Sequence, residues 1–212
     1  MRIQGFTFNM FQENTFIIWD ESNSCIIIDP GCYTEEEEKV LINFIEKNSL
    51  IPEKLVNTHC HIDHILGNKT ISERWGLDLY MHKDDLSLLK NAINIADMYG
   101  FNNYKESICN KIYLSDGEKF TFGTSELEIL FTPGHSPGHI CLLNKKEKFI
   151  IAGDVLFNGS IGRTDLPGGD FDTLMNSIRK RLLSLEKDTI VYCGHGPSTT
   201  IGEEKATNPF LQ

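Results

Sequence analysis

The sequence predicts an α/β protein in which helices cover a layered arrangement of strands. Apolar runs of strand length recur along the 212 residues, and several are followed by amphipathic helical segments. One of these runs, residues 26–28, consists only of isoleucine and suits a central strand that is covered on both faces. The chain has no short-period repeat and no Pro/Gly/Ser linker. We therefore expect one domain spanning residues 1–212.

The N-terminal half is expected to alternate strands with helices. Strands are predicted at 3–8, 15–19 and 25–28, and the last of them ends at the turn Asp29-Pro30-Gly31. Thr34 is the expected N-cap of the next helix, whose first turn holds the acids 35–38. A helix dipole favours acids at that place, so they need no functional role. Further elements are expected as a strand at 55–57, a helix at 68–75, a strand at 77–81 and a helix at 84–94.

The C-terminal half is richer in strands. Residues 96–107 are polar and aromatic without a clear period, which leaves a loop and a substrate-facing lid as alternatives. Strands are then predicted at 111–114, 120–122, 127–131, 140–143 and 149–152. A helix is expected at 171–185, because Leu174, Ile178, Leu182 and Leu185 share one face. A strand at 189–192 and a short helix or coil near 202–207 complete the prediction.

Composition and charge narrow the classes of partner. The net charge is −10, whereas nucleic-acid backbones and anionic membranes select basic surfaces. No apolar run approaches the ~20 residues of a membrane span, and the N-terminus has no apolar signal segment. The six cysteines lack paired spacing, which is typical of reduced thiols. We expect a cytoplasmic protein with a small-molecule substrate and no nucleic-acid or membrane partner; the oligomeric state stays open.

The segment Thr-His-Cys-His-Ile-Asp-His at 58–64 gathers His59, His61, Asp63 and His64 directly after a predicted strand. Buried imidazoles at such density would each need a partner, and divalent metal ions satisfy several of them at once. Imidazole and carboxylate ligands suit zinc, iron or manganese rather than calcium or magnesium.

Three further candidate ligands follow apolar runs that end in glycine. His135 follows Gly134, Asp154 follows Gly153, and His195 follows Gly194. Glycine allows a sharp turn and a close approach of the backbone to a site. A closed structural zinc site usually has four ligands, often cysteines. The larger His/Asp set therefore favours two metals with open coordination positions, which is a catalytic arrangement.

The ordered ligand pattern resembles the metallo-β-lactamase superfamily, and within it the small type II glyoxalase-like hydrolases. The resemblance covers nearly the whole chain and is carried by segments 58–64, 133–139, 153–156, 159–169, 194–197 and 208–211. It implies an αββα sandwich, in which two mixed sheets pack face to face with helices outside. The flavodiiron branch of the superfamily is set aside, because residue 61 is His where that branch carries Glu.

The resemblance also implies the roles of the ligands. One metal would be held by His59, His61 and His135, and the second by Asp63, His64 and His195, with Asp154 bridging. Zinc is the favoured metal, with iron or manganese as alternatives. Asp63 and Asp154 are expected to be catalytic residues as well as ligands.

The expected reaction is hydrolysis of a thioester of the S-lactoylglutathione type by a metal-bridging hydroxide. A thiolate leaves without strong general-acid help, because its conjugate acid has a pKa near ~8.5. Full-length type II glyoxalases carry an additional helical domain that helps to bind glutathione. This chain ends about where the metal domain ends, which leaves open whether glutathione is part of the substrate.

Two alternatives remain from the sequence. Sulfur dioxygenases of the same superfamily share the cluster motif and use one iron, held by the equivalents of His59, His135 and Asp154. A non-catalytic metal-binding protein is the second alternative. A secreted β-lactamase is disfavoured by the lack of a signal segment, and a nuclease by the acidic charge.

Residues near the candidate ligands are expected to have supporting roles. His139 is interpreted as structural or as an outer partner of a ligand, and His82 as a surface or core histidine. Asp29 is expected either to hold a ligand histidine or to cap its own turn. Arg163 and Asp165 are expected to form an ion pair that shapes the wall of the site, with substrate contact as the alternative.

Overall fold

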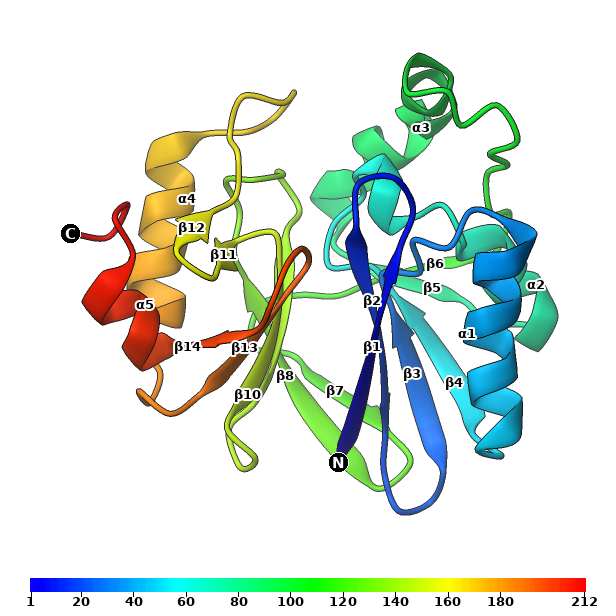
Figure 1. The fold of residues 1–212 in the computed structure, drawn as a ribbon, viewed down its shortest axis with the longest axis horizontal. Coiled ribbons are helices and arrows are strands. Elements are labelled where there is room, and N and C mark those ends of the chain that lie inside the picture. The colour runs from blue at the N-terminus through cyan, green and yellow to red at the C-terminus, as the bar shows by residue number, and fades with distance from the viewer. The chain divides into compact units, whose positions relative to one another are not determined.

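Two six-stranded sheets, each mixing parallel and antiparallel strands, form the framework of the structure, a computed structural model that describes residues 1–212 (Figure 1). The chain divides into two units. Unit 1 comprises residues 1–113 and 121–125, and unit 2 comprises residues 114–120 and 126–212. Each sheet is accompanied by its own helices, so the predicted α/β class is confirmed.

The sheet of unit 1 has the strand order β1-β2-β3-β4-β5-β6. The first three strands pair antiparallel and the last three add in parallel. Every residue of β3 is buried, as predicted for a central strand with isoleucine on both faces. The strand bounds are β1 Arg2–Phe8, β2 Glu13–Trp19, β3 Ser24–Ile28, β4 Ile51–Val56, β5 Leu79–Met81 and β6 Lys111–Tyr113.

The first two helices of unit 1 begin where the sequence indicates, at Glu35 and Asn68, whereas the third begins at Leu86, two residues after its predicted start. They are α1 Glu35–Lys47, α2 Asn68–Trp75 and α3 Leu86–Met98, with short 3₁₀ turns η1 Ile62–His64 and η2 Lys83–Asp85. The helix predicted at 84–94 is longer than expected, so residues 96–98 belong to α3. The rest of segment 96–107 is an irregular loop, in which Phe101 and Ser107 are buried.

One acidic residue at the start of α1 does more than face solvent. Glu37 forms a capping box with Thr34, and its carboxylate also accepts hydrogen bonds from the backbone of Asn9 at 2.7 Å and of Tyr33 at 2.8 Å. The expectation of a favourable helix start is confirmed, and Glu37 additionally connects this start to the backbone of residues before the helix. Its partner Asn9 lies far away in the sequence, so no local pattern reveals the contact.

The sheet of unit 2 has the order β14-β13-β10-β9-β8-β7, and the β7–β8 turn belongs to unit 1. Strands β10 and β13 pair in parallel. The sequence did not indicate β14 or the separate hairpin β11–β12, because their strands have only two residues each. The bounds are β7 Lys119–Phe122, β8 Ser125–Phe131, β9 Ile140–Asn144, β10 Phe149–Gly153, β11 Leu156–Phe157, β12 Ser160–Ile161, β13 Ile190–Cys193 and β14 Thr199–Thr200.

The helix predicted at 171–185 is only partly α-helical. Its first part is α4, Phe171–Ser177, and the chain then forms a π-helical segment, Ile178–Leu182. Leu174, Ile178 and Leu182 are all fully buried, as expected. An apolar stripe predicts which side chains are buried, but it does not distinguish an i→i+4 from an i→i+5 hydrogen-bond pattern. The C-terminal helix α5 spans Ile201–Thr207.

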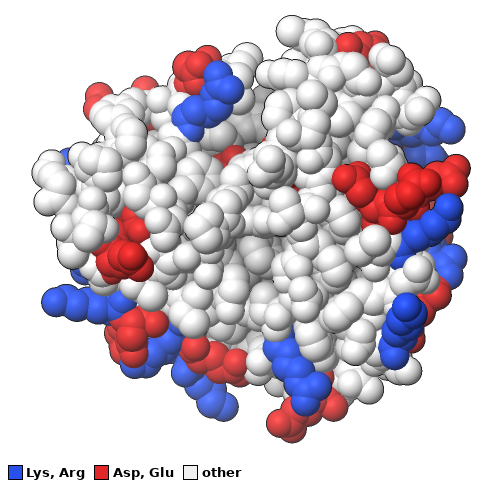
Figure 2. Space-filling model, in the orientation of Figure 1, with Lys and Arg blue, Asp and Glu red and all other residues white.

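The state of the cysteines agrees with the expectation from their spacing. All six cysteines are free thiols, as their spacing predicted. No helix has the length and apolar character needed to span a bilayer. On the face shown in Figure 2, lysine and arginine side chains stand singly or beside acidic ones and form no continuous basic stripe.

Asp20 ties the β2–β3 turn to residue 124 within unit 1. Its carboxylate accepts hydrogen bonds from the Ser22 hydroxyl at 2.5 Å, the Thr124 backbone at 2.7 Å and the Thr124 hydroxyl at 3.0 Å. Burial opposes ionisation of this carboxyl, but the hydrogen bonds from Ser22 and Thr124 outweigh it. They hold the pKa of Asp20 well below its ordinary value.

Asp20→Asn is expected to lower the free energy of unfolding at neutral pH by about 1–3 kcal/mol. Because the folded-state pKa is depressed, the stabilisation by Asp20 is complete above about pH 5 and is lost progressively as the pH falls through roughly 4 and below. Urea unfolding of wild type and variant at pH 7 and pH 3 checks this. A difference between the two proteins that grows on acidification would contradict it.

Candidate metal centre

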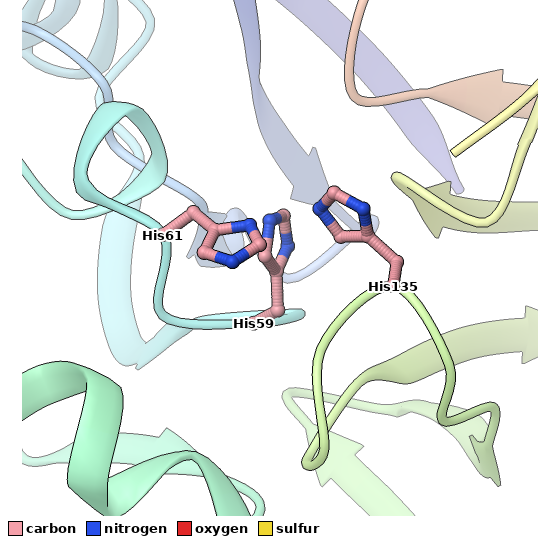
Figure 3. Close-up of side chains that lie close together, drawn as sticks. All are labelled: His59, His61 and His135. Carbon is pink, nitrogen blue, oxygen red and sulfur yellow. The ribbon is translucent and has the colours of Figure 1, made fainter. Parts of the chain in front are cut away.

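The first ligand cluster, which we define as His59, His61, Asp63 and His64, lies in unit 1 directly after β4. The His59 ring centroid lies 4.8 Å from that of His61 and 4.1 Å from that of His64. His59 and His64 are buried, and the residues from Ile62 to His64 form η1. Figure 3 shows the rings of His59 and His61 turned toward each other from the same loop. The structure thus brings the four predicted ligands of this cluster together.

Asp29, at the end of β3, holds this cluster. Its Oδ1 accepts a hydrogen bond from the backbone of Thr58 at 2.7 Å, and its Oδ2 accepts one from the Thr58 hydroxyl at 2.5 Å. The same Oδ2 lies 3.1 Å from Nδ1 of His64. Asp29 therefore holds a candidate ligand histidine, and this contact decides between the two roles that the sequence left open.

These contacts assign the tautomers of two histidines. The Thr58 hydroxyl gives its proton to Asp29, so its oxygen accepts from His59 Nδ1, which lies 3.1 Å away. Nδ1 of His64 donates to Asp29 directly. In both neutral rings the lone pair is then on Nε2. A carboxylate or hydroxyl partner on the other ring nitrogen is how metal-binding histidines are usually fixed.

Backbone contacts hold the cluster loop from remote positions. The side-chain amide of Asn9 donates to the carbonyl of Asp63 at 3.1 Å, and the backbone N–H of Cys60 donates to the carboxylate of Asp85 at 2.8 Å. Glu13 is fully buried, with Oε1 3.8 Å from Nδ1 of His64. Burial raises the pKa of Glu13 well above its ordinary value. Asn9, Asp85 and Glu13 could not be predicted from the sequence, since each approaches the cluster from a separate element.

The second ligand cluster, which we define as His135, Asp154 and His195, lies in unit 2. Asp154 Oδ2 lies 3.5 Å from Nε2 of His135 and 3.4 Å from Nε2 of His195. His135 follows β8, as the loop in Figure 3 shows, while Asp154 follows β10 and His195 follows β13. Parallel β10 and β13 end at one sheet edge, where Gly194 donates to the carbonyl of Gly153 at 2.7 Å. The three side chains thus meet at the ends of these strands.

A divalent cation fits the donor atoms of both clusters. His135 Nδ1 donates to the carbonyl of Arg163 at 2.8 Å, so the lone pair on Nε2 faces Asp154 Oδ2. His64 Nε2 similarly lies 3.7 Å from Asp63 Oδ2. In each of these two contacts, the lone pair of an imidazole nitrogen faces a carboxylate oxygen, and two such acceptor atoms repel each other. A cation bound between them would be coordinated by both atoms, as expected for a metal site.

The remaining candidate residues take up supporting positions. His139 Nε2 accepts the backbone N–H of Asp154 at 3.1 Å, which agrees with an outer role. Arg163 and Asp165 form the expected ion pair through two hydrogen bonds of 2.7 Å, and the bonds from Arg163 lower the pKa of Asp165 to about 2. His82 lies outside both clusters, and its Nδ1 accepts from the backbone of Asp84 at 3.3 Å.

Comparison with known proteins identifies the family. The model of the metallo-beta-lactamase superfamily matches residues 9–195. The chain belongs to the metallo-β-lactamase superfamily. Among its superfamily relatives, the hydroxyacylglutathione hydrolase GloC of Haemophilus influenzae is 38% identical over 212 residues, which cover 100% of this chain and 98% of the relative.

Solved structures of the superfamily agree in fold. The B3 metallo-beta-lactamase BLEG-1 superposes with a TM-score of 0.91 at 33% identity and covers 100% of both chains. TTHA1623 in a di-iron-bound form superposes with a TM-score of 0.89 at 36% identity, over 98% of this chain and 100% of that one. The protein therefore has the metallo-β-lactamase fold and is a metal-dependent hydrolase.

Proposed function

We propose that this metallo-β-lactamase superfamily member hydrolyses a thioester of the S-lactoylglutathione type in the cytoplasm. The observation that carries the proposal is the paired arrangement of ligands and outer partners: Nδ1 of His59, His64 and His135 each faces an oxygen, which leaves Nε2 for a metal. The similarity to a hydroxyacylglutathione hydrolase supports the thioester. Six free cysteines, five of them buried, suit a reducing compartment.

The proposed assignment of the ligands is the one that the family resemblance implies, with residues 1–212 as one domain. In this assignment His59, His61 and His135 would hold one metal, Asp63, His64 and His195 would hold the second, and Asp154 would be a ligand of both. Zinc is the proposed metal, while the di-iron form of TTHA1623 makes iron the first alternative to test. The order of the ligands along the chain, which is that of the superfamily, supports this division.

Each residue of the proposed centre would have a separate role in hydrolysis. When bound, two divalent ions lower the pKa of water and polarise the carbonyl of the substrate. Asp63 and Asp154 orient the attacking water through their carboxylate oxygens. Asp29 and Thr58 keep His59 and His64 in the tautomers that leave Nε2 available, and His139 fixes the backbone of Asp154. The departing thiolate needs no protonation, since its conjugate acid has a pKa of about 8.5.

The proposal is tested by metal quantification combined with a hydrolysis assay. Protein purified without added metal is analysed for zinc, iron and manganese, and is then assayed with S-lactoylglutathione. We expect two metal ions per chain and hydrolysis that a chelator abolishes and zinc restores.

Other results would select another function. One iron per chain together with oxygen uptake on glutathione persulfide would replace the hydrolase with a sulfur dioxygenase. Zinc-loaded protein that is inactive toward thioesters, esters and phosphodiesters would indicate a non-catalytic metal-binding protein.

A further inference from the structure

The small hairpin β11–β12 adjoins all three ligands of the second cluster. It begins two residues after Asp154, and the carbonyl of Arg163, just beyond its end, accepts the Nδ1 hydrogen bond of His135 at 2.8 Å. The ring of Phe157 in β11 packs edge-on against the ring of His195, with centroids 6.1 Å apart and planes at 76°. A displacement of this hairpin would therefore displace each of the three ligands.

The end of the hairpin also lies directly against the backbone of Asp154. A Cβ atom at Gly162 would overlap the carbonyl oxygen of Asp154 and would lie 3.2 Å from Nδ1 of His135. Only glycine permits this approach. A small displacement of the hairpin is thus transmitted to Asp154 and His135 by direct contact.

The hairpin needs external support, because two residues per strand do not make a stable unit. That support comes from the C-terminal segment. Glu204 Oε2 accepts the backbone N–H of Gly159 at 3.0 Å, and the side-chain amide of Asn208 donates to the carbonyl of Ser160 at 3.0 Å. Asn208 also donates to Glu204 Oε2 at 2.7 Å, and the Thr199 hydroxyl donates to Oε1 at 2.6 Å.

The hydrogen bonds of Glu204 and Asn208 to the hairpin indicate a positioning role rather than simple packing. Glu204 and Asn208 are both fully buried, at 0% exposure. Burying a carboxylate is unfavourable unless donors surround it, and an apolar side chain would fill the same space at less cost. A hydrogen-bonded network instead fixes one geometry, here the tip of the hairpin at Gly159 and Ser160.

We propose that Glu204 and Asn208 are positioning residues of the metal centre, which act on His135, Asp154 and His195 through the β11–β12 hairpin. This proposal rests on the proposed role of those three residues as metal ligands. Neither Glu204 nor Asn208 touches substrate or metal in it. The ligand set alone does not explain the closing segment 208–211. In this proposal the segment supports the β11–β12 hairpin through Asn208.

The test measures metal affinity independently of catalysis. Zinc binding to the full-length protein is followed by competition with a chromogenic chelator, for wild type, Glu204→Gln and Asn208→Ala. We expect the affinity for zinc to fall about 10- to 100-fold in both variants, as when outer partners of metal ligands are removed. Circular dichroism and thermal unfolding of the zinc-free proteins monitor the fold.

Two controls separate positioning from general destabilisation. Glu203→Gln makes the same change one position earlier on α5, at an exposed side chain, and should leave zinc affinity unchanged. Asp116→Asn removes a carboxylate that receives two hydrogen bonds from Arg181 in unit 2, away from the hairpin, and should lower stability without lowering zinc affinity. If Glu204→Gln fails to fold, Thr199→Val serves as the milder variant, because it removes the hydrogen bond that the Thr199 hydroxyl donates to Glu204.

The outcomes for the positioning role of Glu204 and Asn208 and for the proposed function are distinct. Wild-type zinc affinity in the folded Glu204→Gln or Asn208→Ala protein would overturn the positioning role, as would a loss no greater than that of Asp116→Asn. Wild-type protein that binds two zinc ions but hydrolyses no thioester would refute the proposed function and leave the positioning role of Glu204 and Asn208 intact. Wild-type protein without zinc affinity would refute both.

Discussion

Asp154→Ala is expected to abolish turnover and to lower the metal content of the purified protein. Asp154 Oδ2 lies within 3.5 Å of Nε2 of both His135 and His195, so a single carboxylate connects the ligands of the second cluster. Its removal takes away the charge that both histidines share and the proposed bridge between two metals. We expect kcat/KM to fall by more than the roughly 10- to 100-fold that the loss of an outer partner costs.

The experiment compares Asp154→Ala and His135→Ala with a matched control. Asp188→Asn alters an exposed carboxylate of the same unit, whose partner is Lys148, and should retain its metal. Metal content by elemental analysis and kcat/KM on the same preparations are the measurements. Unchanged activity in either cluster variant would mean that the second cluster is not the metal centre.

The grouping of the candidate ligands within each cluster could be predicted from the sequence because each side chain follows a local feature. His59, His61, Asp63 and His64 follow one strand within a single short segment, while His135, Asp154 and His195 each follow an apolar run that ends in glycine. Strand, turn and side-chain type are all encoded within about ten residues. The same reasoning gave α2 with its observed bounds, and the buried strand β3.

The supporting residues could not be predicted, because they reach the ligands from distant segments. Asn9 contacts the carbonyl of Asp63, and Asp85 contacts the backbone of Cys60. Glu204 meets Gly159 only after the chain has folded back from α5. Hydrophobic periodicity reports burial of one segment and carries no information about which polar groups meet across the fold.

The short elements of unit 2 escaped prediction for a related reason. A strand of two residues, as in β11, has no period to detect, and its pairing with β12 depends on contacts outside the hairpin. Such segments gain their structure from tertiary hydrogen bonds rather than from local preference. The residues that fix the orientation of the candidate ligands are thus the ones that the sequence does not predict. Their roles must be tested by substituting the residues that contact the ligands.

Asp29→Asn is the most discriminating of these variants, because it reverses the hydrogen-bond direction at two ligands. In the wild type, Asp29 accepts from the Thr58 backbone, from the Thr58 hydroxyl and from His64 Nδ1. An amide keeps one acceptor for the Thr58 backbone but presents an N–H₂ donor in place of Oδ2. The Thr58 hydroxyl then accepts from the amide and turns its proton toward His59 Nδ1.

Both imidazoles must respond by exchanging tautomers. Nδ1 of His59 becomes an acceptor, and Nδ1 of His64 faces a donor, so in each ring the proton moves to Nε2. A protonated Nε2 has no lone pair for a metal. We therefore expect zinc affinity to fall at least ~10- to 100-fold in Asp29→Asn, with kcat/KM lost in proportion at limiting zinc.

Asp20→Asn provides the matched control, since it makes the same carboxylate-to-amide change at a buried position of unit 1 away from the cluster. It should reduce stability and leave zinc affinity unchanged. Long-range ¹H–¹⁵N NMR spectra of the histidine rings in zinc-free protein report the tautomers directly, apart from any effect on activity. If His59 and His64 carry their protons on Nδ1 in both wild type and Asp29→Asn, or if the variant binds zinc as tightly as the wild type, then Asp29 does not set the tautomers and the first cluster is oriented by other contacts.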